Sequence, residues 1–490
     1  MNDGSIMSPT QRALVAVDLG AESCRVSLLR WCGDKPEITL VHRFPNAPYE
    51  RDGHFHWDLA VIQIGVEHGL RLCGRMATEG IASIGVDGWA VDYVRLDENG
   101  AALADPFCYR DDRTLKAEDQ LHQIISAARL RQLTGVQLMR INTLYQQFAD
   151  TAGLDRPWLN LPEYLLSRWG GDAVAEYTNA THTELMDLHN MDWSWEIFAA
   201  AGLDLTKAPA VVPPGTDIGR LTGELAELSA FRATRLIAPA CHDTASAVAG
   251  IPATGTDWGY ISSGTWSLVG TLLEQPRNDV LTAKENFTNL GAVGGRICFH
   301  KNVNGMWLIK QCIETWNSAG LPWQIAELVE AAEAFEARHG APRDLLEVDA
   351  PSLLLAGNMP ERINAQRRAR GLQPLDTSAD NAPEFAHLIF YSLAARYAEV
   401  LRHVEEHGGK RLKRLFVVGG ANRNALLNRL TAEATGLELI CGSPESSTIG
   451  NFAVQLAVLA GQRDPVSGAH AEQVSRWAER LCAAQSTTAG

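Results

Sequence analysis

The 490-residue sequence contains no apolar run close to the ~18 residues that a membrane-spanning helix needs. Its first residues, MNDGSIMSPTQR, are polar and lack the apolar stretch of a secretory signal peptide. These two absences argue against a helical membrane protein and against secretion. We therefore expect a cytoplasmic location and no membrane partner.

No block of Lys or Arg interrupts an acidic background, in which 43 basic side chains stand against 58 acidic ones. We expect no nucleic-acid partner, because binding a phosphate backbone needs a concentrated basic surface. The formal net charge of −15 does not exclude ATP, which backbone N–H groups and a bound cation can hold.

The nine cysteines are scattered, and they form neither a CxxC pair nor a Cys/His cluster with zinc spacing. We interpret them as reduced thiols, and a surface disulfide is the alternative left open. The chain is 46% hydrophobic and 21% charged, a normal globular balance. At ~150 residues per domain, two to four domains are expected.

Residues 14–31 are typical of two strands joined by a tight turn, and residues 38–44 of a third strand. Apolar residues then recur at helical spacing from Leu59 to Cys73, with Asp58 as a plausible N-cap. Buried strands are expected at 81–86 and 91–96. His54 and His56 alternate with aromatic residues, which favours an exposed strand face over a metal site.

The same pattern recurs past the middle of the chain. Residues 259–273 again predict strand, turn and strand, and another strand follows the glycine pair at 294–295. A long amphipathic stretch covers 384–406, and strand–helix alternation continues to about residue 460. The fold class predicted is α/β, with the same unit present twice.

Small residues without strong periodicity at 250–256 mark the expected boundary between the two units. The expected domains are therefore 12–251 and 252–470, followed by a C-terminal segment and tail, 471–490. The charged stretch 358–380, which contains Pro and Gly, is expected to be an exposed, loop-rich insertion.

The segment DLGAESCR, Asp18 to Arg25, has an acidic residue at the end of a buried strand and then a tight turn. Such a turn directs N–H groups at phosphate oxygens, and Asp18 could hold water bound to Mg²⁺. An ordinary hairpin has the same pattern, so this segment alone does not decide between the two interpretations.

The segment CHDTASAVAG, Cys241 to Gly250, follows an expected strand and begins an expected helix. Catalytic groups gather at such strand ends in open α/β sheets. Asp243 could accept a proton from a sugar hydroxyl as that oxygen attacks the γ-phosphate of ATP. The alternative is that Asp243 only caps the helix.

Two further segments are weak signals when taken singly. SSGTWS, Ser262 to Ser267, repeats the small polar turn of the first segment. VVGGAN, Val417 to Asn422, has a glycine pair between a strand and a helix, where a flat ring can lie against the backbone.

Taken in order, the four segments resemble the FGGY carbohydrate kinases, which belong to the actin-like ATPases. Within that family the chain resembles the members that act on L-rhamnulose. The matching stretches run from Val15 to Leu459 and read VAVDLGAES, SIGVDGWAVDYVRLD, YRDDRT, EYTNATHTEL, HDTASAV, YISSGTWSLVG, KNVNGMWL, VVGGANRNALLN and STIGNFAVQLAVL.

The resemblance implies two RNase H-like domains around a central cleft. It also implies transfer of the γ-phosphate of ATP to the 1-hydroxyl of L-rhamnulose, with Mg²⁺. Asp243 would be the proton acceptor and Asp18 the metal residue. Carried over position by position, the remaining residues fall into ketose contacts at Trp89, Ala90, His242 and Thr244, a first phosphate loop at Ala21, Glu22, Ser23, Cys24 and Arg25, and ATP contacts at Thr265, Asn302, Lys310 and Gly420.

The chain departs from the family pattern at five positions. Glu22 and Cys24 stand where the loop usually has Ser and Gly, and Gly88 and Ala90 replace Thr and Gly in the sugar-contact segment. Lys310 stands where a Gln is usual. These changes leave the exact ketose open, with L-fuculose and D-xylulose as alternatives.

Two other classes of function are weighed against the sugar kinase. One is a non-metabolic actin-like ATPase, which would not need HDTASAV. The other is a sugar sensor with weak turnover, suggested only by the altered loops. Monomer and homodimer are both compatible with the sequence.

Overall fold

The computed structural model describes residues 11–150 and 155–486. The chain forms two compact units, which we call unit 1 and unit 2. Unit 1 contains the described residues up to Thr254, with 272–299 and 446 onwards, and unit 2 contains 255–271 and 300–445. The first break falls inside the stretch 250–256. Packing nevertheless groups two later segments with unit 1, which a linear division at residue 251 does not describe.

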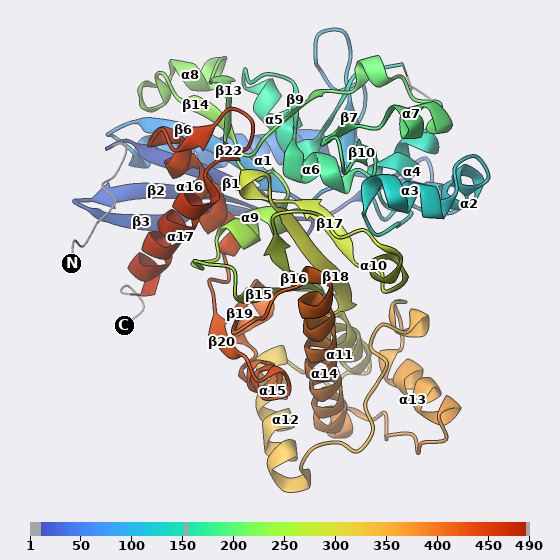
Figure 1. The fold of residues 1–490 in the computed structure, drawn as a ribbon. Coiled ribbons are helices and arrows are strands. Elements are labelled where there is room, and N and C mark those ends of the chain that lie inside the picture. The colour runs from blue at the N-terminus through green and yellow to red at the C-terminus, as the bar shows by residue number, and fades with distance from the viewer. Residues whose placement is uncertain (1–10, 151–154, 487–490) are drawn as a thin grey trace. The chain divides into compact units, whose positions relative to one another are not determined.

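Unit 1 is built on a six-stranded sheet with the order β13-β14-β6-β1-β2-β3 (Figure 1). β1 pairs antiparallel with β2, and β2 with β3, whereas β6 and β14 run parallel to β1. The predicted hairpin and third strand are confirmed. The sheet strands in chain order are β1 (Ala13–Leu19), β2 (Ser23–Cys32), β3 (Lys35–Pro45), β6 (Ile81–Gly88), β13 (Thr216–Arg220) and β14 (Arg235–Ala238).

The central strand β1 is buried along its whole length. Its sequence, ALVAVDL, is an almost continuous apolar run, which is typical of a strand covered by helices on both faces. The one charged residue, Asp18, stands near its carboxyl end. A charge at this position can be kept only by compensating polar neighbours.

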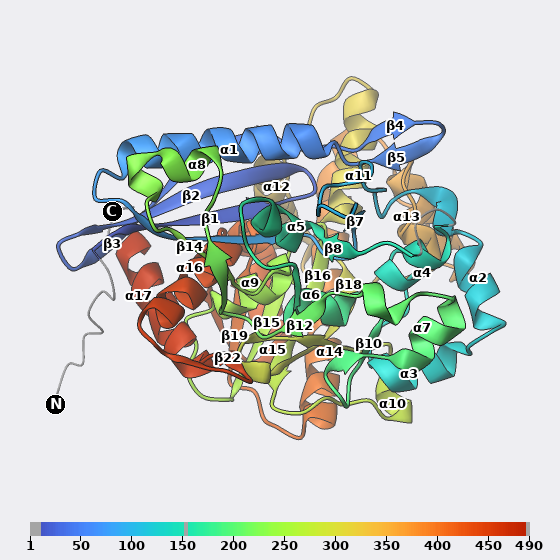
Figure 2. The same ribbon diagram turned by 90° about the horizontal axis from the view of Figure 1, so that it is seen from above.

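Helix α1 (Leu59–Met76) covers β2 and β3, as Figure 2 shows. Asp58 caps the helix by accepting a hydrogen bond from the N–H of Val61 at 2.9 Å. The predicted N-cap and the predicted buried stripe are both confirmed. A Cβ added at Gly65 would lie 2.6 Å from the ring of Phe44, so glycine lets this helix lie close against the sheet.

Helices α9 (Asp243–Ala249) and α16 (Ser446–Leu459) pack against each other in unit 1. A Cβ added at Gly450 would lie 1.8 Å from the carbonyl oxygen of Ser246, and one added at Gly250 would lie 2.1 Å from that of Ser446. The backbones of the two helices are therefore in close contact. Since α16 is buried all round, apolar residues occur on every side of it.

The remaining elements of unit 1 lie mostly between β6 and β13, and all of them except α17 are short. They are β4 (Tyr49–Arg51), β5 (His54–His56), β7 (Tyr93–Arg95), α2 (Ala117–His122), α3 (Ala127–Thr134), α4 (Thr143–Phe148), β8 (Trp158–Asn160), α5 (Leu161–Arg168), β9 (Val174–Glu176), α6 (Tyr177–His182), β10 (Met186–Asp187), β11 (Asp192–Trp193), α7 (Trp195–Ala201), β12 (Ala210–Val212), α8 (Glu224–Glu227), α10 (Val280–Lys284), β17 (Thr288–Gly291), β21 (Arg463–Asp464), β22 (Gly468–Ala469) and α17 (Ala471–Ser486).

The sheet of unit 2 repeats the strand order of the first, with β18-β16-β15-β19-β20 in place of β3-β2-β1-β6-β14. β15 pairs antiparallel with β16 and parallel with β19. The predicted duplication of one α/β pattern is confirmed. The strands are β15 (Trp258–Ser263), β16 (Trp266–Leu273), β18 (Ile297–Asn304), β19 (Arg414–Val418) and β20 (Glu438–Cys441).

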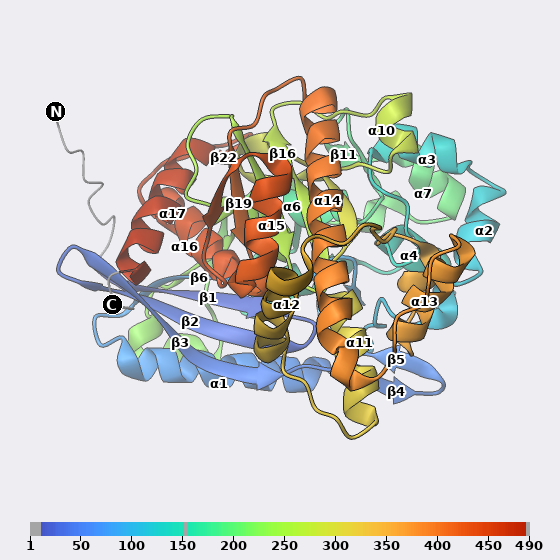
Figure 3. The same cartoon turned by 90° about the horizontal axis from the view of Figure 1, so that it is seen from below.

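The long helix α14 (Ala382–Gly408) packs against α12 (Ile325–His339) and α15 (Ala425–Thr435) in unit 2 (Figure 3). The three helices share one polar contact point at Glu336, which accepts hydrogen bonds from Tyr391 and from Arg429. α11 (Trp307–Ser318) also packs against α14.

The stretch 358–380 is loop-rich and exposed only in its second half, so the prediction from its composition is wrong for its first half. It contains α13 (Met359–Ala369), which begins after Asn358, whose side chain accepts from the N–H of Glu361 at 3.2 Å. Met359 and Ile363 are 0% exposed. The many charged residues of this segment outweigh its few buried apolar ones in the composition, so the composition alone does not predict the helix.

None of the helices within residues 11–150 and 155–486 combines the length and the apolar character that crossing a membrane requires. All nine cysteines lie in the described part of the chain, and each is a free thiol there.

Candidate active site

Three neighbouring strands of unit 1 have an aspartate near their carboxyl end or in the loop that follows. Asp18 on β1 lies opposite Asp87 on β6 in the parallel register. After β14 the chain reaches Asp243 through a loop in which His242 pairs with Gly88. Because parallel strands end at the same edge of a sheet, the three carboxylates gather at the edge where open α/β sheets bind ligands.

The turn between β1 and β2 depends on glycine. A Cβ added at Gly20 would lie 2.4 Å from the carbonyl oxygen of Ser23, so any larger residue would have to shift the turn. Asn46 holds the turn from the side, because its Nδ2 donates to the carbonyl of Gly20 and its N–H to that of Glu22, each at 3.0 Å. The side chain of Glu22 is exposed.

Cys24, one of the predicted phosphate-loop residues, lies in β2 with its side chain 0% exposed. It pairs with Leu19 on one side and Phe44 on the other, so an extended strand replaces the positive φ that a glycine here could have adopted. Burial raises the pKa of the thiol to about 12. Only the backbone of Cys24 can therefore contact a phosphate, whereas Arg25 offers its side chain.

Asp18 is held from two sides. Its Oδ2 forms an ion pair with Arg25 at 3.3 Å and accepts a hydrogen bond from the hydroxyl of Ser447 at 2.9 Å. Ser447 lies in the first turn of α16. The carboxylate is thus fixed by the turn beside it and by a helix from the far end of the chain.

Asp87 accepts a hydrogen bond at Oδ2 from Nδ2 of Asn451 at 2.6 Å. The orientation of the Asn451 amide, and so the direction of this bond, is set by the carbonyl of Val15 through Gln455. Gln455 donates from Nε2 to the carbonyl of Val15 at 3.0 Å and to Oδ1 of Asn451 at 2.7 Å, which leaves Nδ2 of Asn451 as the donor to Asp87. Burial and the nearby Asp18 raise the pKa of Asp87 well above its ordinary value.

Asp243 begins α9, and 40% of its side-chain surface is exposed. Oδ1 accepts from the hydroxyl of Thr244 at 3.2 Å and lies 3.4 Å from Nε2 of His242. Desolvation by the surrounding protein raises the pKa of Asp243 to about 6. Burial lowers the pKa of His242 to about 4, so at neutral pH the imidazole is uncharged. A carboxylate only accepts hydrogen bonds, so Nε2 of His242 would carry the proton that faces Asp243.

His182 lies edge-on to His242 with ring centroids 4.8 Å apart. Burial lowers its pKa to about 3, so this ring is also uncharged at neutral pH. The sequence gives little sign of this pairing, because the two residues lie in different elements of the fold.

The predicted ketose contacts Trp89 and Ala90 are 6% and 7% exposed. Nε1 of Trp89 donates to Oδ2 of Asp92 at 2.9 Å, and Nε1 of Trp57 donates to the same oxygen at 2.5 Å. The centroids of the two indole rings are 4.6 Å apart. Asp92 thereby anchors Trp89 in the core, and a sugar could touch only the small part of its surface that remains open.

The residue after Ala90 has a strained backbone. Val91 has a φ of 74°, in the left-handed region that a β-branched residue rarely adopts. Its carbonyl accepts from the hydroxyl of Thr143 at 2.7 Å and from Nε2 of Gln146 at 3.2 Å. Both partners belong to α4. Strain of this kind, roughly 1–3 kcal/mol, persists only where surrounding contacts enforce it, and it occurs often at functional sites.

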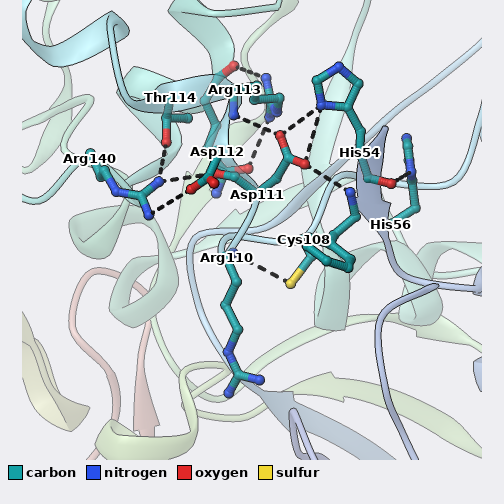
Figure 4. Close-up of polar contacts among 11 residues, drawn as sticks. His54, His56, Cys108, Arg110, Asp111, Asp112, Arg113, Thr114 and Arg140 are labelled. Atoms are coloured by element: carbon teal, nitrogen blue, oxygen red, sulfur yellow. Dashed lines mark hydrogen bonds and ion pairs between the residues drawn. The ribbon is translucent and has the colours of Figure 1, made fainter. Parts of the chain in front are cut away.

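A second aspartate cluster, centred on Asp111, lies in the YRDDRT segment (Figure 4). The Asp111 carboxylate accepts from the N–H of Phe55 at 2.8 Å, from the N–H of Arg113 at 2.9 Å and from Nδ1 of His54 at 3.0 Å. Asp111 therefore ties this segment to β5. The expectation that both histidines lie on an exposed face is wrong for His56, which is 4% exposed because its ring packs on Phe107.

In unit 2, the predicted ATP contact Thr265 lies in the turn between β15 and β16. The N–H of Met306 donates to the carbonyl of Gly264 at 3.2 Å, and that of Trp307 to the carbonyl of Thr265 at 3.1 Å. The turn is therefore fixed against the start of α11. Lys310 lies one turn further along this helix, and Asn302 lies in β18.

Gly420 follows β19 and is exposed. A Cβ added there would meet no atom within 4 Å, whereas one added at Gly419 would lie 2.6 Å from the carbonyl oxygen of Ser263. Asn422 fixes the loop by donating from Nδ2 to the carbonyl of Gly442 at 2.6 Å. Of the two glycines, only Gly419 is required by the packing of the described residues.

The predicted site residues divide cleanly between the units. Unit 1 contains the predicted metal residue, phosphate loop, ketose contacts and base, at Asp18, 21–25, 89–90 and 242–244. Unit 2 contains the four ATP contacts predicted for the second half of the chain. Within residues 11–150 and 155–486, no group of three His, Cys, Asp or Glu side chains is arranged to hold a metal ion.

Solved structures share this fold. A xylulose kinase from Lactobacillus acidophilus matches with a TM-score of 0.73 at 15% identity, and the match covers 98% of each chain. A gluconate kinase from the same organism matches with a TM-score of 0.74 at 14% identity, again over 98% of each chain. The sheets of both units thus belong to a known kinase fold.

Sequence relatives extend the comparison. A rhamnulokinase from Bacteroides thetaiotaomicron is 35% identical over 460 residues, which is 92% of each chain. A rhamnulokinase from Enterococcus faecalis is 34% identical over 461 residues, which is 93% of this chain and 91% of the relative. Two family models also match: the N-terminal domain of the FGGY family of carbohydrate kinases at residues 13–250 and its C-terminal domain at 259–459. The chain therefore belongs to the FGGY family of carbohydrate kinases, which use ATP as co-substrate and adopt the actin-like ATPase fold.

Proposed function

We propose that this carbohydrate kinase transfers the γ-phosphate of ATP to the 1-hydroxyl of L-rhamnulose, giving L-rhamnulose 1-phosphate and ADP. The observation that carries the proposal is identity of about 35% to two rhamnulokinases over more than nine-tenths of the chain. The likeness to the xylulose and gluconate kinases is under 16% identity and speaks for the fold alone.

In this reaction Asp243 accepts the proton of the 1-hydroxyl as that oxygen attacks the γ-phosphorus. The new O–P bond forms as the bond to the ADP oxygen breaks, and the proton ends on the carboxylate. An exposed fraction of 40% makes the carboxylate reachable, and Thr244 and His242 fix its Oδ1. Base catalysis of this kind contributes about 10²–10⁴-fold.

The phosphates of ATP would meet the backbone of the turn 21–25 and the side chain of Arg25 in unit 1. Thr265, Asn302, Lys310 and Gly420 would contact the nucleotide in unit 2. Phosphoryl transfer depends mainly on positioning and on stabilising charge, which suits a site made of backbone N–H groups and a few cations.

Mg²⁺ would be held at Asp18. The residues present fit this ion, because Mg²⁺ needs only one or two carboxylates besides phosphate and water oxygens. Asp18 and its register partner Asp87 supply such oxygen atoms. The bound ion would neutralise negative charge on the phosphates, while Arg25 and Ser447 keep the Asp18 carboxylate in place.

The departures from the family pattern bear on affinity and on the choice of sugar. The side chain of Glu22 is exposed and that of Cys24 is in the core, so the backbone of the turn stays the part that would meet the phosphates. Ala90 is buried beside the strained Val91, and its methyl group therefore alters the packing under the sugar segment.

A panel of ketoses in an assay that couples ADP release to NADH oxidation tests the proposal. We expect kcat/KM to be highest for L-rhamnulose, with L-fuculose and D-xylulose at least tenfold lower, and ³¹P NMR to show a primary phosphate ester. A higher kcat/KM for another ketose would overturn the choice of sugar and leave the family assignment in place. A cytoplasmic location and an oligomeric state no larger than a dimer stay predictions.

A further inference from the structure

The loop that precedes Asp243 is held by two side chains from the EYTNATH segment. The N–H of Cys241 donates to Oε2 of Glu176 at 2.8 Å, and the N–H of His242 donates to Oγ1 of Thr178 at 3.2 Å. These are the two backbone N–H groups directly before Asp243. Both are buried, and a buried N–H needs a partner inside the protein.

Glu176 and Thr178 are coupled to each other as well. Glu176 ends β9 and caps α6 by accepting from the N–H of Thr178 at Oε1, at 3.0 Å. The hydroxyl of Thr178 contacts the other oxygen, Oε2, at 2.5 Å. Both residues are 0% exposed. The two oxygens of one carboxylate thus serve different N–H groups, one in the helix and one in the loop before Asp243.

The loop is tied on its other side to the predicted sugar segment. The N–H of Gly88 donates to the carbonyl of Cys241 at 2.9 Å. The peptide unit at Cys241 is therefore held through its N–H by Glu176 and through its carbonyl by β6. Asp243 begins its helix two residues later, so the direction of its side chain depends on these contacts.

We infer that Glu176 and Thr178 are positioning residues for the phosphoryl transfer, which set the place of Asp243 through the backbone of Cys241 and His242. The inference rests on the proposed function, since it takes Asp243 as the proton acceptor. The physical reason is that a displacement of about 1 Å in a reacting group costs on the order of 10²-fold in rate. Neither residue contacts the substrate in this role.

Three substitutions separate positioning from simple stabilisation. Thr178→Val removes the hydroxyl at nearly constant volume, and Thr178→Ser retains it as the conservative rescue. Glu176→Gln keeps the shape, but an amide has only one acceptor oxygen. It cannot accept from the N–H groups of both Thr178 and Cys241, as the carboxylate does.

Glu163 provides a matched control. It is also a 0%-exposed glutamate, and it accepts from the N–H of Glu176 at 3.1 Å and from Nδ2 of Asn179 at 3.0 Å. Glu163→Gln likewise loses one acceptor in the same core, but none of these bonds reaches residues 239–243. A purely structural effect should be similar at both glutamates.

Two readouts are needed. The first is kinetic: we expect Glu176→Gln and Thr178→Val to lower kcat roughly 10- to 100-fold. The KM for ATP should stay within about threefold, and Thr178→Ser and Glu163→Gln should keep near wild-type kcat. The second is amide hydrogen exchange of Cys241 and His242, resolved by fragmentation mass spectrometry. Exchange should accelerate in Glu176→Gln and Thr178→Val only.

Wild-type kcat in folded Thr178→Val would overturn the inference, whatever the exchange shows. Equal losses in Glu176→Gln and Glu163→Gln, with amide exchange of Cys241 and His242 unchanged in both, would overturn it too, because they would indicate a structural effect alone. If Glu176→Gln fails to fold, the Thr178 pair decides. Should L-rhamnulose prove not to be the substrate, kcat is measured on the ketose that the wild type prefers. Should no ketose be turned over, unchanged exchange at Cys241 and His242 would still reject the two contacts.

Discussion

The hydroxyl of Ser447 donates a hydrogen bond of 2.9 Å to the carboxylate of Asp18, although 429 positions separate the two residues in the chain. The contact places the start of α16 beside the turn that we assign to phosphate binding. The same carboxylate also pairs with Arg25. Asp18 therefore has a fixed position before any ion binds, which is what a metal residue requires.

Replacing Asp18 by alanine should weaken Mg²⁺-dependent activity more than it weakens sugar binding. The carboxylate is the proposed holder of the ion, whereas the predicted sugar contacts lie on other strands. Titrating Mg²⁺ against the rate, with sugar affinity measured separately by calorimetry, checks this. Ser447→Ala, which removes only one hydrogen bond to Asp18, serves as the milder control. An unchanged Mg²⁺ requirement and rate in Asp18→Ala would reject the assignment.

Asp243→Asn should remove about 10²–10⁴-fold of kcat while the fold and ATP binding stay nearly intact. Asparagine keeps the size of the side chain and can still accept from Thr244, but it cannot take up the proton. Stopped assays with purified protein and a fluorescent ATP analogue measure the two effects. Near wild-type turnover would show that another group is the base. Loss of folding would instead indicate that Asp243, the residue after the N-cap His242, mainly stabilises the start of α9.

The pH dependence of kcat should reflect the same carboxylate. Desolvation raises the pKa of Asp243 to about 6, and its 40% exposure limits the effect. We therefore expect an apparent pKa between the ordinary value of about 4 and about 6. The base works only when ionised, so kcat should be constant above that pKa and fall about tenfold per pH unit below it.

The titration of His242 does not obscure this loss of rate at low pH. Burial lowers the pKa of His242 to about 4, so the imidazole stays uncharged over nearly all of the pH range in which the rate would be measured. Measurements of kcat at saturating sugar and ATP from pH 4.5 to 8.5 would test the expectation. A rate that rises as the pH falls through this range contradicts a carboxylate base.

The adjacent glycines 419 and 420 should respond oppositely to alanine. Gly420→Ala meets no atom within 4 Å, so stability should change by less than about 0.5 kcal/mol. A raised KM for ATP would then reveal the nucleotide contact. Gly419→Ala should destabilise strongly, since its φ is +87° and its Cβ would lie 2.6 Å from a carbonyl oxygen. Thermal melts and ATP kinetics of both variants give the comparison, and an unchanged ATP KM in Gly420→Ala would remove that residue from the site.

Much of the fold could be predicted from local patterns in the sequence. The apolar spacing from Leu59 to Cys73 and the N-cap Asp58 follow from helix periodicity alone, and α1 confirms them. His56 was misjudged because alternation in a short strand does not say which face is covered. Phe55 is 42% exposed, whereas His56 is buried under Phe107.

The site itself was predictable only in part. Motif resemblance pointed to Asp18 and Asp243, which the sheet brings to one edge. The residues that hold them could not be foreseen, because Ser447 and Glu176 reach their partners through pairing of distant segments. A lone serine or glutamate in a sequence has no periodicity that marks such a contact.

The last prediction concerns the two units. The proposed acceptor groups, His242 to Thr244, belong to unit 1, and the proposed ATP contacts Thr265 and Gly420 belong to unit 2. Phosphoryl transfer needs donor and acceptor oxygens close together and in line, with water excluded. We therefore expect sugar and nucleotide together to stabilise one closed arrangement.

We predict that the flexible point for this closure lies within residues 250–255, and packing favours one end of that range. Gly250 is packed too tightly to move freely, because its Cβ position lies 2.1 Å from the carbonyl oxygen of Ser446. Gly255 is the better candidate, because its φ is +76° and a Cβ added there would meet no atom nearer than 3.8 Å. Gly255→Ala should therefore alter closure with little effect on the core of unit 1.

Because coupling between two ligands is reciprocal, each should strengthen binding of the other by the same factor. Calorimetry can titrate L-rhamnulose into the free protein and into protein saturated with a non-hydrolysable ATP analogue. Small-angle scattering on the same samples should show a smaller radius of gyration when both ligands are present. Equal sugar affinities, with the same radius of gyration in all states, would contradict closure. The kinase assignment would stand, because phosphoryl transfer would then occur in an arrangement that the ligands do not change.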